Sequence, residues 1–217
     1  MTENDDLDTS QAHPRGAIAK IEHILLAAKS DDDGQIGLGE LSDAMEERAF
    51  GLLMLILALP CCLPFVYLLP QIVALPMAVL AWQMAQGRRA PWLPGFLRQR
   101  RMPVAGLLDV VRRTKRYAGW LEQLAHPRLA GLTDHGGMRV IGILMVVPCL
   151  SILLPLPLTN TVPGIGVAVA SAGVIERDGV FVILGLLIGL AWVLLLLVGG
   201  PALLYFLIDW VRGGAAA

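Results

Sequence analysis

The sequence has few charged residues for its length. Asp, Glu, Lys and Arg make up only 16% of its 217 residues, whereas soluble globular proteins contain about 25%. Three stretches, 51–87, 140–175 and 179–208, contain no charged residue at all. Each stretch is longer than the roughly 20 apolar residues that span a bilayer as a helix. The composition therefore excludes an ordinary soluble domain and predicts an integral membrane protein.

Other absences exclude several classes of function. The polar first 50 residues lack a basic segment followed by an apolar one, so we expect no cleavable signal peptide. Cys61, Cys62 and Cys149 lie in apolar stretches and are predicted to be packing residues. The histidines show no metal-ligand spacing, and no nucleophile elbow, phosphate-binding loop or His-Glu-x-x-His motif occurs. We therefore expect no metal, no cofactor and no catalytic residue, and favour a protein that is not an enzyme.

The charges that are present form two blocks of opposite sign. Residues 1–50 are mainly acidic, whereas residues 88–139 contain many arginines and few acidic residues. Because cytoplasmic loops of membrane proteins carry the excess of Lys and Arg, we expect this basic loop and the N-terminus to lie in the cytoplasm. Its expected partners are anionic lipid headgroups rather than nucleic acid.

The acidic N-terminal region contains two segments whose apolar residues recur at helical spacing. The apolar positions are Ile18, Ile21, Ile24, Leu25 and Ala28, then Leu41, Met45 and Ala49. We predict two short amphipathic helices that pack either on the membrane surface or on the basic loop. Residues 29–40 between them partly match a calcium-binding loop, but Lys29 stands where the first carboxylate belongs. An Asp-Gly turn before a helix is the better interpretation.

The first two uncharged stretches resemble each other. At an offset of 87 residues, Pro70 aligns with Pro157 and Pro76 with Pro163. We infer an internal duplication from this shared spacing. Because proline interrupts a helix interior, each stretch is predicted to form a hairpin that breaks across 70–76 or 155–163. Hairpins that cross the membrane twice and re-entrant hairpins both fit this pattern.

The predicted fold is an all-α integral membrane protein with five parts. In the last part, Gly185 and Gly189 allow close helix packing, and residues 199–201 are expected to end the helix before a short return or an interfacial helix. The parts are an amphipathic N-terminal region (1–50), the first hairpin (51–87), the basic loop with an amphipathic helix (88–139), the second hairpin (140–175) and a C-terminal membrane segment (176–211).

Interrupted membrane segments at matching places in two halves indicate a binding site. The second hairpin tip carries polar residues that either bind a substrate or only cap the broken helix. Polar and cationic residues at the end of the first hairpin either hold a lipid phosphate or anchor the protein at the headgroup level. The residues expected to bind substrate are Thr159, Asn160, Thr161, Gln83, Arg88 and Arg89.

A second group of residues is expected to shape the fold. The turn at 176–179 either is simply solvated or forms an ion pair with an arginine of the first hairpin. The residues expected to have structural roles are Pro70, Pro76, Pro157, Pro163, Trp92, Glu176, Arg177 and Asp178.

Two motifs carry a family resemblance. QMAQGRRAPWLP at 83–94 resembles the Gln-Met-x-x-Gly-Arg-x-x-Pro-Trp-Leu-Pro motif of the exopolysaccharide synthesis protein ExoD family. PLPLTNTVP at 155–163, followed by ERDG at 176–179, resembles that family's second motif. The resemblance extends from about residue 38 to residue 197. It implies a multi-pass protein of the bacterial inner membrane that is associated with exopolysaccharide synthesis.

Two functions are compatible with this resemblance. The first is handling or transport of an anionic lipid-linked substrate, such as one carried on a polyprenyl phosphate, through a pocket at the hairpin tips. The second is non-catalytic assembly of polysaccharide synthesis or export proteins. Self-association into a homo-oligomer is compatible with either function.

Overall fold

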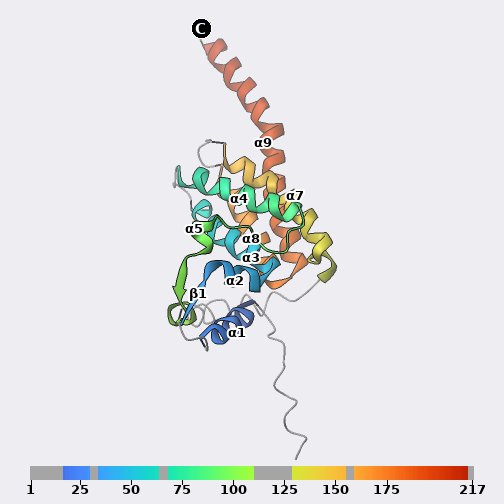
Figure 1. Ribbon diagram of the computed structural model, residues 1–217. Helices are drawn as coiled ribbons and strands as arrows, with labels where there is room; N and C mark the ends of the chain where they lie inside the picture. Colours follow the sequence, from blue (N-terminus) through green and yellow to red (C-terminus); the bar gives the residue numbers. More distant parts are fainter. Residues whose placement is uncertain (1–16, 30–33, 64–67, 110–128, 155–158, 215–217) are drawn as a thin grey trace, which may run out of the picture. The chain divides into compact units, whose positions relative to one another are not determined.

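Two segments that are distant in the sequence form the first of two structural units. The computed structural model describes residues 17–29, 34–63, 68–109, 129–154 and 159–214 (Figure 1). Within it, Met1–Met45 and Leu93–Leu124 belong to one unit, and Glu46–Trp92 and Ala125–Ala217 belong to the other.

The first unit joins the N-terminal region to the basic loop. A short antiparallel sheet pairs Ile36 with Met102, and the guanidinium of Arg98 forms an ion pair with Asp43. Of the two predicted locations, the second N-terminal helix therefore lies against the loop, and the strands beside it were not predicted from the sequence. The elements are α1 (Ala17–Lys29), β1 (Gln35–Gly37), α2 (Leu38–Met45), α5 (Gly95–Arg98) and β2 (Arg101–Pro103). The amphipathic helix predicted in the loop falls largely on 110–128, outside the described residues.

The segment that partly matches a calcium loop has another role where it is described. Residues 30–33 lie outside the described residues, and Gly34 has a left-handed φ of 55°. The carboxylate of Glu40 accepts a hydrogen bond of 3.1 Å from the backbone N–H of Gly37. This contact is one half of a capping box at the start of α2. Glu40 thus stabilises the start of α2, while the predicted Asp-Gly turn includes Asp33, which lies outside the described residues.

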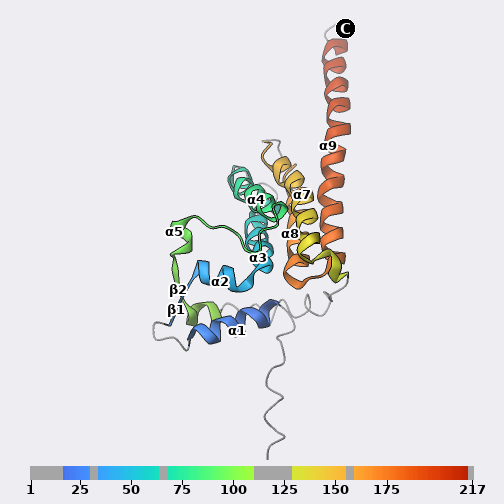
Figure 2. The same cartoon turned by 45° about the vertical axis from the view of Figure 1, so that its right-hand side comes forward.

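The second unit is helical. Helix α3 packs against α4 and α8, and α7 packs against the same two helices, so the four form a closed ring. Helix α9 packs mainly on α8 and extends beyond the other helices of this unit (Figures 1 and 2). The elements are α3 (Glu47–Ala58), the 3-10 helix η1 (Leu59–Cys62), α4 (Leu69–Ala85), η2 (Ala130–Leu132), α7 (His135–Ile152), α8 (Thr161–Glu176) and α9 (Gly179–Gly214).

The helices of this unit are apolar both inside and outside. The buried core is rich in methionine, with Met54, Met77 and Met145 fully buried, while the outer faces of α4 and α9 expose many leucine and other apolar side chains. Two segments, His135–Ile152 and Gly179–Pro201, are long and apolar enough to cross a membrane, and α4 and α8 are shorter. A helix that is apolar all round is typical of a protein core or a membrane span. The pattern is consistent with the predicted membrane protein.

The prediction of helix breaks at the prolines is wrong for the first hairpin and close for the second. The break expected across 70–76 is wrong, because Pro70 lies in the first turn of α4 and Pro76 lies inside that helix. A proline in the first turn costs no intrahelical hydrogen bond, since that N–H has no partner in any case. In the second hairpin, α7 ends at Ile152 and α8 begins at Thr161, close to the predicted break, and Pro163 lies in the first turn of α8. Pro157 lies outside the described residues.

The C-terminal helix is longer than predicted. The break expected at 199–201 is wrong, because α9 continues through Pro201 to Gly214. One proline removes one backbone hydrogen bond, and helices in apolar surroundings retain such residues when the neighbouring turns stay bonded. Neither a short return nor a separate interfacial helix is present over the described residues.

Candidate functional site

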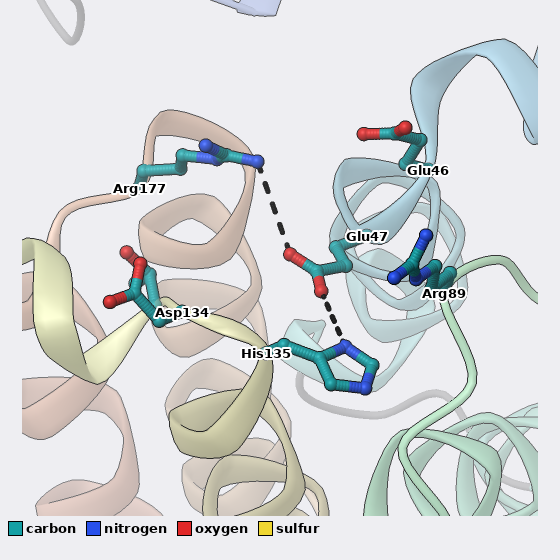
Figure 3. A pocket seen from close by; sticks show the side chains of 7 residues that line it. Glu46, Glu47, Arg89, Asp134, His135 and Arg177 are labelled. Atoms are coloured by element: carbon teal, nitrogen blue, oxygen red, sulfur yellow. Dashed lines mark hydrogen bonds and ion pairs between the residues drawn. The ribbon is translucent and has the colours of Figure 1, made fainter.

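Charged residues gather where the helix ends of the second unit meet. The starts of α3, α7 and α9 and the ends of α4 and α8 all lie at one end of the helix ring (Figure 2). A cavity of about 300 Å³ opens among them. The lining residues are Glu46, Glu47, Arg89, Thr133, Asp134, His135 and Arg177 (Figure 3).

Glu47 connects three helix ends within this cavity. Its Oε1 lies 3.1 Å from Nδ1 of His135 at the start of α7, and its Oε2 lies 3.9 Å from Nη2 of Arg177 beyond α8. Figure 3 shows the carboxylate of Glu47 between these two groups. Only 16% of the Glu47 side chain is exposed, so its contacts with His135 and Arg177 are partly shielded from water. Glu47 therefore links α3 to both arms of the second hairpin.

Two lining residues have a strained backbone. Glu46 has φ 54° and Arg177 has φ 56°, a left-handed region that non-glycine residues rarely adopt. Arg177 occupies the position after α8 where glycine is usual, and the N–H of Asp178 donates to the carbonyl of Gly173 at 2.8 Å. Strained non-glycine residues are concentrated at binding sites and switches. Their presence at this cavity makes it the candidate functional site.

The turn at 176–179 is built rather than simply solvated. Asp178 is fully buried, and its Oδ1 accepts a hydrogen bond of 2.9 Å from the N–H of Val180, which caps α9. Arg177 forms an ion pair with Glu47, and Glu176 attracts Arg48 at the same end of the first hairpin, in the sense of the predicted pairing of an acidic turn residue with an arginine. The turn thus fixes Arg177 at the cavity.

Arg48 adds a partly buried positive charge next to Glu47. Burial lowers the pKa of Arg48, the like charge of Arg177 lowers it further, and Glu176 opposes both effects. Its Nη1 is buried without a hydrogen-bond partner. Charges of both signs are therefore crowded at this end of the helix ring.

Of the predicted residues at the end of the first hairpin, one lines the cavity and another supports the segment that carries it. Arg89 lines the cavity, while Arg88 is exposed and is not among the lining residues. Gln83 is buried, with its Oε1 accepting from the Trp92 N–H at 2.6 Å and its Nε2 donating to the Trp92 carbonyl at 3.4 Å. The amide of Gln83 therefore holds the segment that carries Arg89, with Gly87 at φ 75° in the turn between them.

The residues of the second hairpin tip lie at the other end of α8. The carbonyl of Thr159 accepts a hydrogen bond of 3.0 Å from the indole N–H of Trp192. Asn160 precedes α8 without a side-chain capping bond, and its Oδ1 is buried and unpartnered. Thr161 is the first residue of α8, and the 16 residues of this helix separate the tip from the cavity by about 24 Å at 1.5 Å per residue. The structure thus does not bring the predicted residues into one site.

Sequence reasoning missed all four acidic and histidine residues that line the cavity. Glu46, Glu47, Asp134 and His135 stand just before the two uncharged stretches, and this shared position is the signal that could have identified them. In the described part of the chain, no three His, Cys, Asp or Glu side chains lie close enough to hold a metal ion. The cavity can instead bind polar and charged groups through hydrogen bonds and ion pairs.

Comparison with known proteins identifies the family. The family described as "Exopolysaccharide synthesis, ExoD" matches residues 21–198. The chain belongs to the ExoD family. This ExoD family protein is 31% identical to Protein ExoD of Rhizobium meliloti (strain 1021) over 151 residues, which cover 68% of this chain and 63% of that protein. It is 28% identical over 201 residues to an uncharacterized protein of Synechocystis sp., and the match covers 86% of this chain and 94% of that protein. No solved structure matches. Membership of the family associates this chain with exopolysaccharide synthesis.

Proposed function

We propose that this ExoD family protein handles an anionic lipid-linked saccharide during exopolysaccharide synthesis, and that the charged cavity binds its headgroup. The observation that carries this proposal is a cavity of mixed charge at the end of a helix ring whose outer surface is apolar. A headgroup in the cavity would leave its lipid chain beside the exposed apolar side chains of α4 or α9.

The charges of the cavity favour a ligand that combines phosphate with hydroxyl groups. Arg89 and Arg177 can each form paired hydrogen bonds with phosphate oxygens. Three carboxylates line the same cavity and would repel a bare polyanion. Sugar hydroxyl groups donate to carboxylates, so a sugar attached to the phosphate matches both kinds of lining residue. A polyprenyl-phosphate-linked sugar has this chemistry.

The proposed location is the inner membrane of a bacterium, with several passes and the basic loop and N-terminus in the cytoplasm. Helices α3 with α4, and α7 with α8, act as two duplicated hairpins that begin and end at the cavity side. Re-entrant hairpins remain the alternative to full crossings, since α4 and α8 have 17 and 16 residues and a full span needs about 20.

Native mass spectrometry of the gently purified protein tests this function. We expect a phosphate-bearing lipid to co-purify with the wild type and to be lost from Arg89→Ala. Arg88→Ala is the matched control, because the adjacent arginine does not line the cavity, and it should retain the lipid. Asn160→Ala tests the tip separately and should also retain the lipid. Equal retention by Arg89→Ala and Arg88→Ala would refute the cavity as the binding site.

A second candidate function, as a non-catalytic assembly factor, is supported by the surface of the first unit. Phe96 on α5 is 73% exposed, and a nearby cleft is lined by Glu40, Arg98 and Arg101 among others. Exposed aromatic and arginine side chains are typical of protein interfaces. Phe96→Ala should then reduce co-purification of polysaccharide synthesis proteins, while Phe96→Leu should retain it. Unchanged co-purification in both variants would remove this candidate.

A further inference from the structure

The cavity combines residues from corresponding places in the two hairpins. The offset of 87 residues that aligns the four prolines also aligns residues at the starts of α3 and α7, next to the cavity. The aligned pairs are Glu46 with Thr133, Glu47 with Asp134, and Arg48 with His135. Both residues of the first two pairs line the cavity, and His135 of the third pair does so as well.

The packing of the helices is reciprocal in the same sense. The first arm of each hairpin packs on the second arm of the other, α3 on α8 and α7 on α4. Each contact is made at a glycine of the first arm. A Cβ at Gly51 would lie 2.8 Å from the carbonyl oxygen of Ser171, and a Cβ at Gly142 would lie 2.7 Å from the carbonyl carbon of Met84. In both hairpins, therefore, the first arm packs closely on the second arm of the other hairpin.

The two aligned carboxylates are in different states. Glu47 contacts His135 and Arg177. Asp134 stands at the capping position of α7, with φ −73° and ψ 165°, yet its side chain makes no capping bond. Its carboxylate has no hydrogen bond or ion pair within the described part of the chain. Asp134 is exposed and lines the cavity, so its carboxylate can accept hydrogen bonds from a ligand that enters there.

We propose that Glu47 and Asp134 are the equivalent carboxylates of a duplicated site, and that Asp134 accepts hydrogen bonds from the sugar hydroxyl groups of the ligand. The proposal rests on the function proposed above and identifies the side chain that binds the saccharide. Neighbouring hydroxyl groups of a sugar can donate to both oxygens of one carboxylate. Arg89 binds the phosphate and makes no contact with the sugar. The cationic part of the cavity thus binds the phosphate, and the acidic part binds the sugar.

Binding of two defined lipids by the full chain tests this division. The probes are a polyprenyl diphosphate without sugar and the same lipid linked to a hexose, titrated into protein in nanodiscs and followed by native mass spectrometry. Asp134→Asn should weaken binding of the sugar-linked lipid about tenfold, the loss expected for one charged hydrogen-bond acceptor, and leave binding of the bare lipid unchanged. Asp134→Ser should have the same effect. Because asparagine and serine are both good capping residues, neither variant should destabilise the start of α7. Asp109→Asn, outside the cavity, should change neither affinity.

The outcomes separate the two proposals. Arg89→Ala should weaken binding of both lipids, because both carry phosphate. If the wild type binds both lipids and Asp134→Asn weakens neither, or both equally, the role of Asp134 is refuted while the proposed function stands. If the wild type binds neither lipid, the proposed function fails and the role of Asp134 fails with it.

Discussion

The contact between α8 and α9 depends on glycines whose roles differ along one helix. A Cβ at Gly185 would overlap the backbone nitrogen of Ala170 and lie 2.8 Å from its Cα. A Cβ at Gly189 would lie 3.1 Å from the Cβ of Pro148 on α7, and one at Gly199 would meet nothing within 4 Å. We therefore expect alanine to have three different effects at these three positions of α9.

The magnitudes follow from two opposing terms. Replacing glycine by alanine inside a helix gains up to about 1 kcal/mol from helix propensity. At Gly185 the new methyl group meets backbone, which cannot rotate away, and such overpacking costs about 1–3 kcal/mol. Gly185→Ala should thus be less stable than Gly199→Ala by about 2 kcal/mol, with Gly189→Ala between them. For a chain of this size, that difference corresponds to roughly 4–8 °C in Tm.

Thermal unfolding of the three variants in one detergent, followed by circular dichroism, measures this order. The Tm of Gly199→Ala should equal or exceed that of the wild type, whereas the Tm of Gly185→Ala should fall below it. Equal Tm values for Gly185→Ala and Gly199→Ala would refute the close approach of α9 to α8. The same result would also contradict the helix packing that positions the turn at 176–179.

Three further predictions concern the supports of the cavity. Gly87→Ala should destabilise the protein by about 1–2 kcal/mol because alanine is strained in a left-handed backbone. A Cβ at Gly87 would also lie 2.8 Å from Cζ of Arg139. In an unfolding titration, adding Arg139→Ala to Gly87→Ala should therefore recover only the steric part of the loss. Asp178→Ala should lower the unfolding free energy by about 1 kcal/mol through loss of the α9 cap, and a matching loss in Asp178→Ser would contradict a capping role. Gln83→Leu should speed hydrogen exchange at the Trp92 amide about tenfold or more, and unchanged exchange there would show that Gln83 does not hold this segment.

The helical content of the chain could be predicted because its signals are local. Long uncharged stretches indicated the helices, and the spacing of Gly185 and Gly189 indicated a close helix contact, which Gly185 makes with α8. The role of Pro70 could not be read in the same way. Whether a proline breaks a helix or begins one depends on where the helix starts, and α4 starts at Leu69, next to Pro70, which is itself buried. Tertiary packing therefore decided what the local pattern left open.

The candidate site was predicted less well, since its contacts join residues far apart in the sequence. Glu47 and His135 meet across 88 positions, and no spacing rule for catalytic or metal-binding residues applies to them. Arg89 was predicted from its place at a helix end, and it does line the cavity. The tip residues, such as Asn160, were chosen for polarity in an apolar segment, a signal that carries no information about which end of α8 holds the cavity.

The turn at 176–179 connects α9 directly to the residues that line the cavity. Helix α9 has 36 residues and is therefore about 54 Å long, well beyond the roughly 30 Å of a hydrocarbon core. A bilayer of different thickness changes the tilt of such a helix. Because the buried Asp178 caps α9 and Gly185 brings α9 close to α8, we expect a tilt of α9 to move the turn that carries Arg177. If α9 crosses a membrane, the thickness of that membrane would then change the distance between Arg177 and Glu47.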